Sequence, residues 1–186
     1  MIPANASLLL AALAVAALAG PAPSRAEPRS REAEALRAIF PEAERFESRD
    51  LLLDDEAAER LAELARARVA DRLVTFYTAR RGGEVAGYAA VHTHVVRTKR
   101  ETFAIAFEPD GRIRRIVILA FLEPPEYQPA ERWLAQLHGK GEKDRLAVGD
   151  DLAPIAGATL SARGIAERSR WLLQALLAAR RRGDVP

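Results

Sequence analysis

The spacing of apolar residues along the chain is helical at both ends and strand-like in the middle. Near the start, Leu36, Ile39 and Phe40 recur at helical spacing, and Pro41 ends this first predicted helix. A second predicted helix covers 54–73, with acidic residues early and arginines late, as the helix dipole favours. The pattern therefore predicts two helices before the strand-rich part begins.

Four antiparallel strands are predicted in the middle of the chain, where apolar residues alternate with polar ones or run together. Short polar turns separate the strands: Gly82-Gly83, then RTKRE, then EPDGR with Pro109 and Gly111. The last strand is apolar at successive positions, which indicates burial on both faces. The predicted strands cover 73–80, 84–97, 101–108 and 112–121.

The remaining chain returns to helical patterns. The stretch LEPPEYQP is typical of a loop, and AERWLAQLHGKG predicts a short helix that stops at Gly139. Ile165, Leu172 and Leu176 recur at helical spacing and predict a long last helix that ends in arginines before Gly183. The predicted fold class is α+β, an antiparallel sheet of about four strands with N-terminal helices and a long C-terminal helix packed on it.

The first 26 residues are typical of a signal peptide. The apolar run Leu8–Gly20 is shorter than the roughly 20 residues that span a membrane, and Ser24 and Ala26 suit a cleavage site. An uncleaved membrane anchor is the alternative. The predicted organisation is a signal peptide at 1–26, an N-terminal helical segment at 27–72, and a domain at 73–186 that forms one compact unit with 27–72.

Composition excludes several function classes. Lys and Arg total 28 against 26 Asp and Glu, so the net charge of +2 does not indicate nucleic-acid binding. The chain has no cysteine, which excludes disulfides, iron–sulfur clusters and cysteine-ligated zinc. Nucleophile-elbow, Walker and dinucleotide-binding motifs are absent from the sequence, so we predict no catalytic residue. His92 and His94 share a strand face, but carboxylates at ligand spacing are missing, so we predict no metal site.

The stretch AGATLSARG, just before the last predicted helix, is the candidate for binding chemistry. Gly157 allows unusual dihedrals and close backbone approach, and the small Ala156 and Ala158 leave room around it. Thr159 and Ser161 lie at the predicted helix N-terminus, where free N–H groups and the helix dipole favour an anion such as phosphate. The alternative is that one of these two hydroxyl residues only caps the helix.

This stretch resembles the flavinylation motif of the FMN-binding domain family. That family includes the C subunit of sodium-pumping NADH:quinone reductase and the G subunit of Rnf complexes. Its pattern is an Asp followed by Ser/Thr-Gly-Ala-Thr, whose final Thr carries FMN through a phosphoester bond. Gly157, Ala158 and Thr159 match this pattern, and Ser161 matches a frequent following hydroxyl. Upstream, the Gly-Tyr strand, the PDGRI turn, LEP and RWLAQLHGKG resemble the family's sheet region and the segment after it, so the resemblance covers about 73–177.

The resemblance implies a small, free-standing exported member with FMN covalently attached at Thr159. It also implies that Glu123, Pro124 and the segment Trp133–Lys140 lie near the flavin. Two positions depart from the motif, because Ala153 and Ala156 stand where the family has Asp and Ser/Thr. The cofactor-binding residues expected on this basis are Ala156, Gly157, Ala158, Thr159, Leu160, Ser161, Glu123 and Lys140.

The function implied is that of a periplasmic electron carrier rather than a substrate-converting enzyme. Its expected partners are a flavin transferase for maturation and membrane or periplasmic redox proteins, with no nucleic acid. Two alternatives remain: a module that binds FMN without a covalent bond, as an accessory or sensor, and a structural domain that has lost the cofactor. Trp171 is expected to pack in the core, and Tyr88 against the sheet, rather than on a flavin.

Overall fold

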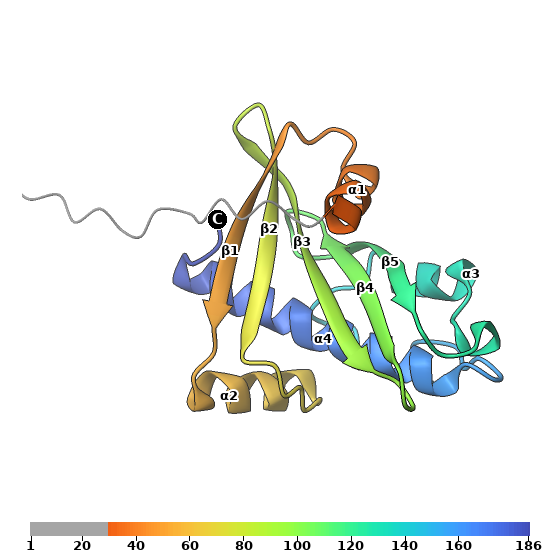
Figure 1. The fold of residues 1–186 in the computed structure, drawn as a ribbon. Coiled ribbons are helices and arrows are strands. Elements are labelled where there is room, and N and C mark those ends of the chain that lie inside the picture. Colours follow the sequence, from red (N-terminus) through yellow and green to blue (C-terminus); the bar gives the residue numbers. More distant parts are fainter. Residues whose placement is uncertain (1–29) are drawn as a thin grey trace, which may run out of the picture.

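A five-stranded antiparallel sheet with helices on both faces forms the fold (Figure 1). The structure is a computed structural model that describes residues 30–186, so the predicted signal peptide lies outside the described residues. Neighbouring strands follow chain order, and the predicted α+β class is confirmed. The strands are β1 Arg45–Leu52, β2 Leu73–Arg81, β3 Glu84–Val95, β4 Arg100–Phe107 and β5 Ile113–Phe121. The helices are α1 Ser30–Ile39, α2 Asp55–Ala65, α3 Glu131–Leu134 and α4 Thr159–Arg182, with short 3₁₀ turns η1 Pro125–Tyr127 and η2 Ala135–Leu137.

All four predicted strands are present, and β1 is an additional strand at the edge of the sheet, in the segment where we expected only helices. It pairs with β2 along its whole length. Its sequence gives a weak strand signal because Glu47, Arg49 and Asp50 interrupt the apolar alternation. Contacts from β2 satisfy two of these charges: Arg80 Nε donates to Glu47 at 3.1 Å and Thr75 Oγ1 donates to Asp50 at 2.7 Å.

The second predicted helix begins where expected but ends early. Asp54 caps α2 by accepting a backbone N–H bond of 2.8 Å. The helix stops at Ala65 because Arg66 takes a left-handed φ of 48°, and the N–H groups that follow the helix bond back to its last turn. The predicted span of 54–73 is therefore wrong in its second half, where 66–72 is not helical.

Two hydrophobic layers hold the helices on the sheet. The larger layer lies between the sheet, α2 and α4, and buries Phe103 and Trp171, so the expected core position of Trp171 is confirmed. The smaller layer lies under α1 on the opposite face and contains Phe40. Tyr88 packs in the larger layer, as expected, and its hydroxyl donates to the carbonyl oxygen of Pro186. The last residue of the chain is thereby tied to the sheet.

Helix α4 runs across the sheet face opposite to α1 (Figure 1). It starts at Thr159 and ends, as predicted, before Gly183, which has a left-handed φ of 75°. Inside the helix, Gly164 lies against β3, and a Cβ at this position would be 2.6 Å from His94 Nε2. Of the helices within residues 30–186, none combines the length and the apolar character of a membrane span.

Candidate functional site

Thr159 is the first residue of α4 and is half-buried. Its Oγ1 donates a hydrogen bond to the carbonyl oxygen of Ile155, 2.8 Å away in the preceding loop. The N-cap position belongs to Ala158, whose methyl side chain makes no capping bond. The alternative interpretation, in which Thr159 or Ser161 is the helix cap, is therefore wrong. The Thr159 hydroxyl lies at the start of the helix but does not cap its first N–H groups.

The start of α4 is a positive region of the surface. The first N–H groups of a helix have no partner within the helix, and the helix dipole adds partial positive charge there. All of α4 is described, and its first turn has no acidic side chain to offset this charge. Arg163 is exposed one turn after Thr159, on the same side of the helix. An anionic group at Thr159 would therefore meet N–H groups, the dipole and a guanidinium.

The loop that leads into α4 packs against η1. Gly157 has a left-handed φ of 81°, and a Cβ here would lie 3.7 Å from the carbonyl oxygen of Glu126. Glycine reaches this backbone conformation without strain. Ala158 is buried, whereas Ala156 and Leu160 are exposed on either side. The three residues that match the motif thus lie partly at the surface, with Gly157 exposed, Thr159 half-buried and Ala158 packed inward.

Two side chains of the segment Trp133–Lys140 hold this loop at Ala153. Trp133 Nε1 donates to the carbonyl oxygen of Ala153 at 2.7 Å, and the N–H of Ala153 donates to Gln136 Oε1 at 2.8 Å. Ala153 occupies the position at which the motif has Asp, and both of its backbone groups are engaged. The structure therefore places this segment against the loop that ends at Thr159.

Lys140 and Asp151 form an ion pair at the beginning of the same loop. Lys140 Nζ lies 3.1 Å from Asp151 Oδ2, and the carboxylate also accepts the N–H groups of Leu146 and Ala147 at 3.1 and 2.8 Å. Burial alone would raise the pKa of Asp151, but the hydrogen bonds from Ala147, Lys140 and Leu146 outweigh it and lower the pKa. Asp151 thus fixes the loop, and Lys140 has its charge paired there.

Glu123 fixes the turn between β3 and β4. Its Oε1 accepts the N–H groups of Thr98 and Lys99 at 2.6 and 2.8 Å, and the Thr98 hydroxyl at 3.2 Å. The bond from the Thr98 N–H is the main cause that lowers the pKa of Glu123. In the described structure Glu123 therefore joins this turn to the connection between β5 and η1. Its contact with a cofactor stays a prediction.

Arg97 and Tyr127 extend the surface beside Thr159, and the sequence did not reveal them. The Arg97 guanidinium lies 4.9 Å from the centre of the Tyr127 ring, which connects the β3–β4 turn to η1. Because η1 also touches the loop at Gly157, the turn, η1 and the start of α4 form one continuous surface. Arg163 could have been found from its spacing of four residues after Thr159. The pairing of Arg97 with Tyr127 is tertiary and leaves no local signal.

This surface suits a ligand with an anionic end and a flat aromatic part. The helix start and Arg163 offer positive charge, while Tyr127 and Leu160 offer apolar surface, Leu160 being 56% exposed. FMN has both features, a phosphate and an aromatic ring system. The residues present therefore fit this cofactor.

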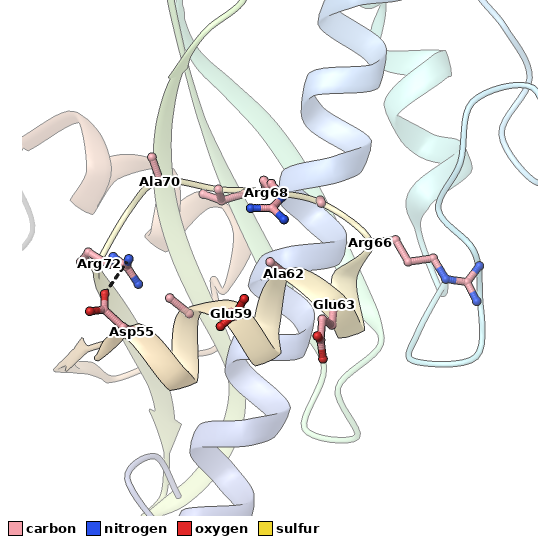
Figure 2. Close-up of a pocket in the computed structure, with 11 residues that line it drawn as sticks. Asp55, Glu59, Ala62, Glu63, Arg66, Arg68, Ala70 and Arg72 are labelled. Atoms are coloured by element: carbon pink, nitrogen blue, oxygen red, sulfur yellow. Dashed lines mark ion pairs between the residues drawn. The ribbon is translucent and has the colours of Figure 1, made fainter.

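The groove drawn in Figure 2 lies elsewhere, between α2 and the segment 66–72 that returns to β2. Its volume is about 760 Å³, and an ion pair of 2.9 Å between Asp55 and Arg72 lies at one end. Glu59 and Arg68 add opposite charges to its walls. Its lining includes none of the expected cofactor-binding residues, so the candidate site and this groove are separate features.

His92 and His94 share a face of β3, and their ring centres are 5.9 Å apart. Each histidine has one carboxylate near its Nε2: Asp71 at 3.8 Å from His92 and Glu101 at 3.3 Å from His94. Within residues 30–186, no three side chains of the His, Cys, Asp or Glu type are grouped so that they could hold a metal ion.

No protein-family model and no curated protein matches this sequence. Among solved structures, the chain is similar to the crystal structure of NqrC from Shewanella oneidensis. The two chains are 16% identical, the match covers 77% of this chain and 88% of NqrC, and the TM-score is 0.50. At this identity the likeness establishes a shared fold.

Proposed function

We propose that this chain is a flavoprotein electron carrier that holds FMN through a phosphoester bond to Thr159. The position of Thr159 carries the proposal, because the Gly-Ala-Thr sequence ends on the first residue of a long helix and its hydroxyl does not cap that helix. The fold shared with NqrC supports it, since the motif resembles that of a family containing the C subunit of sodium-pumping NADH:quinone reductase.

Attachment requires help from outside the chain. A threonine hydroxyl is a weak nucleophile at neutral pH, and Asp151, the nearest acid in the preceding loop, is engaged by Lys140. We therefore propose a flavin transferase that moves the FMN part of FAD to Thr159. A new bond from Thr159 Oγ1 to phosphorus replaces the pyrophosphate bond of FAD, the hydroxyl proton is released, and AMP leaves.

The residues around Thr159 have distinct roles in this proposal. The Ile155 carbonyl orients Oγ1 before attachment. The first N–H groups of α4 and Arg163 stabilise the phosphoryl charge, while Tyr127 and Leu160 provide apolar surface for the ring system. When bound, FMN supplies one- or two-electron transfer. Because the bond is through phosphate, the ring system stays chemically unmodified.

The proposal includes a place of action. Residues 1–26 direct export, and the mature protein works in the periplasm, where a covalent bond prevents loss of the cofactor by diffusion. Electrons pass between membrane-associated or periplasmic redox proteins, and the chain converts no substrate of its own.

Intact mass spectrometry tests the proposal. The full chain is expressed in an exporting host together with a flavin transferase and is analysed after denaturation. We expect a mass gain of one FMN less one water, located on the peptide that contains Thr159 and absent in Thr159→Ala. Thr75→Ala is the matched control, because it removes a hydroxyl on β2, outside the candidate site, and should leave attachment intact.

The other outcomes separate the alternatives. A yellow protein that loses its colour on denaturation would indicate a module that binds FMN without a covalent bond. A colourless protein that takes up neither free nor transferase-delivered flavin would overturn the proposal and indicate a structural domain. Where attachment is incomplete, Ala153→Asp with Ala156→Ser should raise the attached fraction, because these changes restore the motif.

A further inference from the structure

The turn between β3 and β4 carries three positively charged side chains within four residues. Arg97, Lys99 and Arg100 are all exposed, and none of them forms an ion pair in the part of the chain that the structure describes. At the other end of the β4–β5 hairpin, by contrast, Arg112 and Arg114 both pair with carboxylates. The positive charge of the β3–β4 turn is therefore accessible to an anionic partner.

Two large aliphatic side chains lie beside this charge. Val95 at the end of β3 is 56% exposed, and Leu122, just after β5, is 59% exposed. Val95 pairs with Arg100 across β3 and β4, and the N–H of Leu122 donates to the carbonyl oxygen of Arg100 at 3.1 Å. The three residues are therefore neighbours on adjacent strands. Residues 95–100 and Leu122 together form what we term the hairpin tip.

Glu123 fixes the hairpin tip from beneath. The side chain is buried at 8% exposure, and its Oε1 accepts the N–H groups of Thr98 and Lys99 at 2.6 and 2.8 Å. Three cations thus meet two carboxylates, that of Glu123 and that of the exposed Glu126 on η1, so the charge of this surface is positive. Because the backbone of the turn is held, binding at the tip costs little ordering of the chain.

The two sides of this end of the molecule differ in charge. Figure 1 shows the hairpin tip at the lower end of the sheet, close to the start of α4, whereas α2 lies under β1 and β2. Helix α2 is acidic at its surface, with four exposed carboxylates: Asp55, Glu56, Glu59 and Glu63. A negatively charged surface is therefore attracted to the tip and repelled by α2, which favours an approach in which the tip makes contact first.

We propose that the hairpin tip docks the protein on an anionic membrane surface. Arg97, Lys99 and Arg100 bind lipid phosphates, and Val95 and Leu122 enter the boundary between headgroups and acyl chains. Each Lys or Arg near such a surface strengthens binding about fivefold. An acidic protein would satisfy the charges as well, but two aliphatic side chains on a projecting turn form no broad patch of the kind that a protein interface buries. Lipid is therefore the favoured occupant.

The inference goes beyond the proposed function, because it concerns side chains of the turn and holds with or without FMN. The two proposals meet in space, since the contact of Arg97 with Tyr127 joins the tip to η1, and η1 lies against Gly157. Docking would thus bring the start of α4 toward the membrane, which suits exchange of electrons with membrane-associated proteins. Thr159→Ala should bind vesicles as the wild type does, so failure of either proposal leaves the other intact.

Cosedimentation of the exported chain with lipid vesicles tests the charges. We expect binding to vesicles of phosphatidylcholine and phosphatidylglycerol in equal parts, much weaker binding to phosphatidylcholine alone, and a decrease with added salt. Combining Arg97→Gln, Lys99→Gln and Arg100→Gln should lower the partition coefficient about a hundredfold. Combining Arg60→Gln, Arg66→Gln and Arg68→Gln, at exposed arginines on and after α2, removes the same charge and is the matched control. Equal losses in both triple variants would overturn the proposal.

The aliphatic side chains distinguish membrane insertion from simple attraction. Val95→Ser with Leu122→Ser should lower binding to the anionic vesicles on the order of tenfold, because less apolar surface leaves water. Leu64→Ser is the control, since Leu64 is 50% exposed on α2, away from the tip. If the serine pair binds as the wild type does while the triple charge variant is weak, the attraction is electrostatic only, as to an acidic protein, and the proposal is wrong.

A fluorescent label keeps the test decisive if residues 1–26 stay attached and hold the chain on vesicles by themselves. The chain has no cysteine, so one introduced thiol can carry a polarity-sensitive dye. We compare Thr98→Cys in the turn with Glu63→Cys on α2. On anionic vesicles, the dye at position 98 should report an apolar environment and the dye at position 63 an aqueous one. The same response at both positions, or none at position 98, would refute docking through the tip.

Discussion

At the scale of single residues, Gly164 shows how α4 and the sheet constrain each other. A glycine inside a helix costs about 1 kcal/mol relative to alanine. Here the missing Cβ leaves room for the ring of His94, which is buried at 7% exposure and has little freedom to move away. Packing against the sheet, rather than helix propensity, therefore explains this glycine.

Gly164→Ala should consequently destabilise the wild-type protein, by about 1–2 kcal/mol, because the clash with His94 exceeds the gain in helix propensity. In a His94→Ala background the ring is absent, and the same change should stabilise by up to about 1 kcal/mol. Urea unfolding of the four proteins in this cycle measures both values. A loss of the same size in both backgrounds would show that His94 is not the cause.

The sequence identified some of the candidate site at this scale but not all of it. Thr159 was found because Gly-Ala-Thr before a helical pattern is a local signal. Arg97 and Tyr127 were missed because their contact joins segments about thirty residues apart, and no spacing along the chain records it. The roles of Trp133 and Gln136 in holding Ala153 also depend on tertiary contacts.

At the scale of secondary-structure elements, Arg170 connects three segments. From α4, its guanidinium donates to the carbonyl oxygens of Ala65 and Arg66 at the end of α2. It also donates to those of Arg145 and Leu146, at 2.9 and 3.0 Å, in the loop that Asp151 fixes. Arginine suits this role because its planar group carries five donors in a fixed arrangement.

Arg170→Lys should therefore lower the free energy of unfolding by about 2–3 kcal/mol, although the charge is retained, because an ammonium group cannot reach carbonyls of both segments at once. Urea unfolding measures the loss. Arg132→Lys, an exposed arginine on α3, serves as the control and should change stability by less than about 0.5 kcal/mol. If both variants lose equally little, Arg170 does not hold the segments together.

The same contacts explain why the end of α2 was predicted too late. The segment 66–72 contains no glycine or proline, so the local sequence gives no stop signal before residue 73. The helix ends instead because Arg66 takes a left-handed conformation, and Arg170 donates hydrogen bonds to the carbonyl groups of Ala65 and Arg66. Apolar periodicity and turn residues predicted four strands and the last helix correctly, because there the local and tertiary preferences agree.

At the scale of the whole molecule, the candidate site and the contact between Gly164 and His94 lie along one helix on one face of the sheet. Thr159 begins α4, and Gly164 meets His94 five residues later, about 7.5 Å along the helix axis. The segments beside Thr159 are the β3–β4 turn, η1 and the loop at 151–158, and each is fixed by its own hydrogen bonds. Packing of α4 on the sheet thus positions the site, and whatever loosens this packing affects the site as well.

Acid should weaken the packing of α4 on the sheet by protonating His92. In the folded chain the pKa of His92 lies at about 3, against 6.5 in its ordinary state, because of burial, then His94 and Arg168. Between these two pH values the unfolded chain binds a proton at His92 and the folded chain does not. The stability contributed by neutral His92 is therefore complete above pH 6.5 and is lost as pH falls toward 3.

Between pH 6.5 and 4.5 the free energy of unfolding should thus fall by about 2 kcal/mol through His92, and urea unfolding across this range measures it. Glu42, Glu47 and Asp151, whose pKa values are also lowered in the fold, add a smaller loss that begins as pH nears their ordinary values at the lower end of this range. His92→Phe keeps a ring in the apolar layer and removes this titration, so most of the decline should be absent over this interval. Burial also lowers the pKa of His138, so His138→Gln, at an exposed histidine, should retain most but not all of the wild-type decline. A decline of the same size in His92→Phe would place the acid sensitivity elsewhere in the molecule and separate it from the packing of α4.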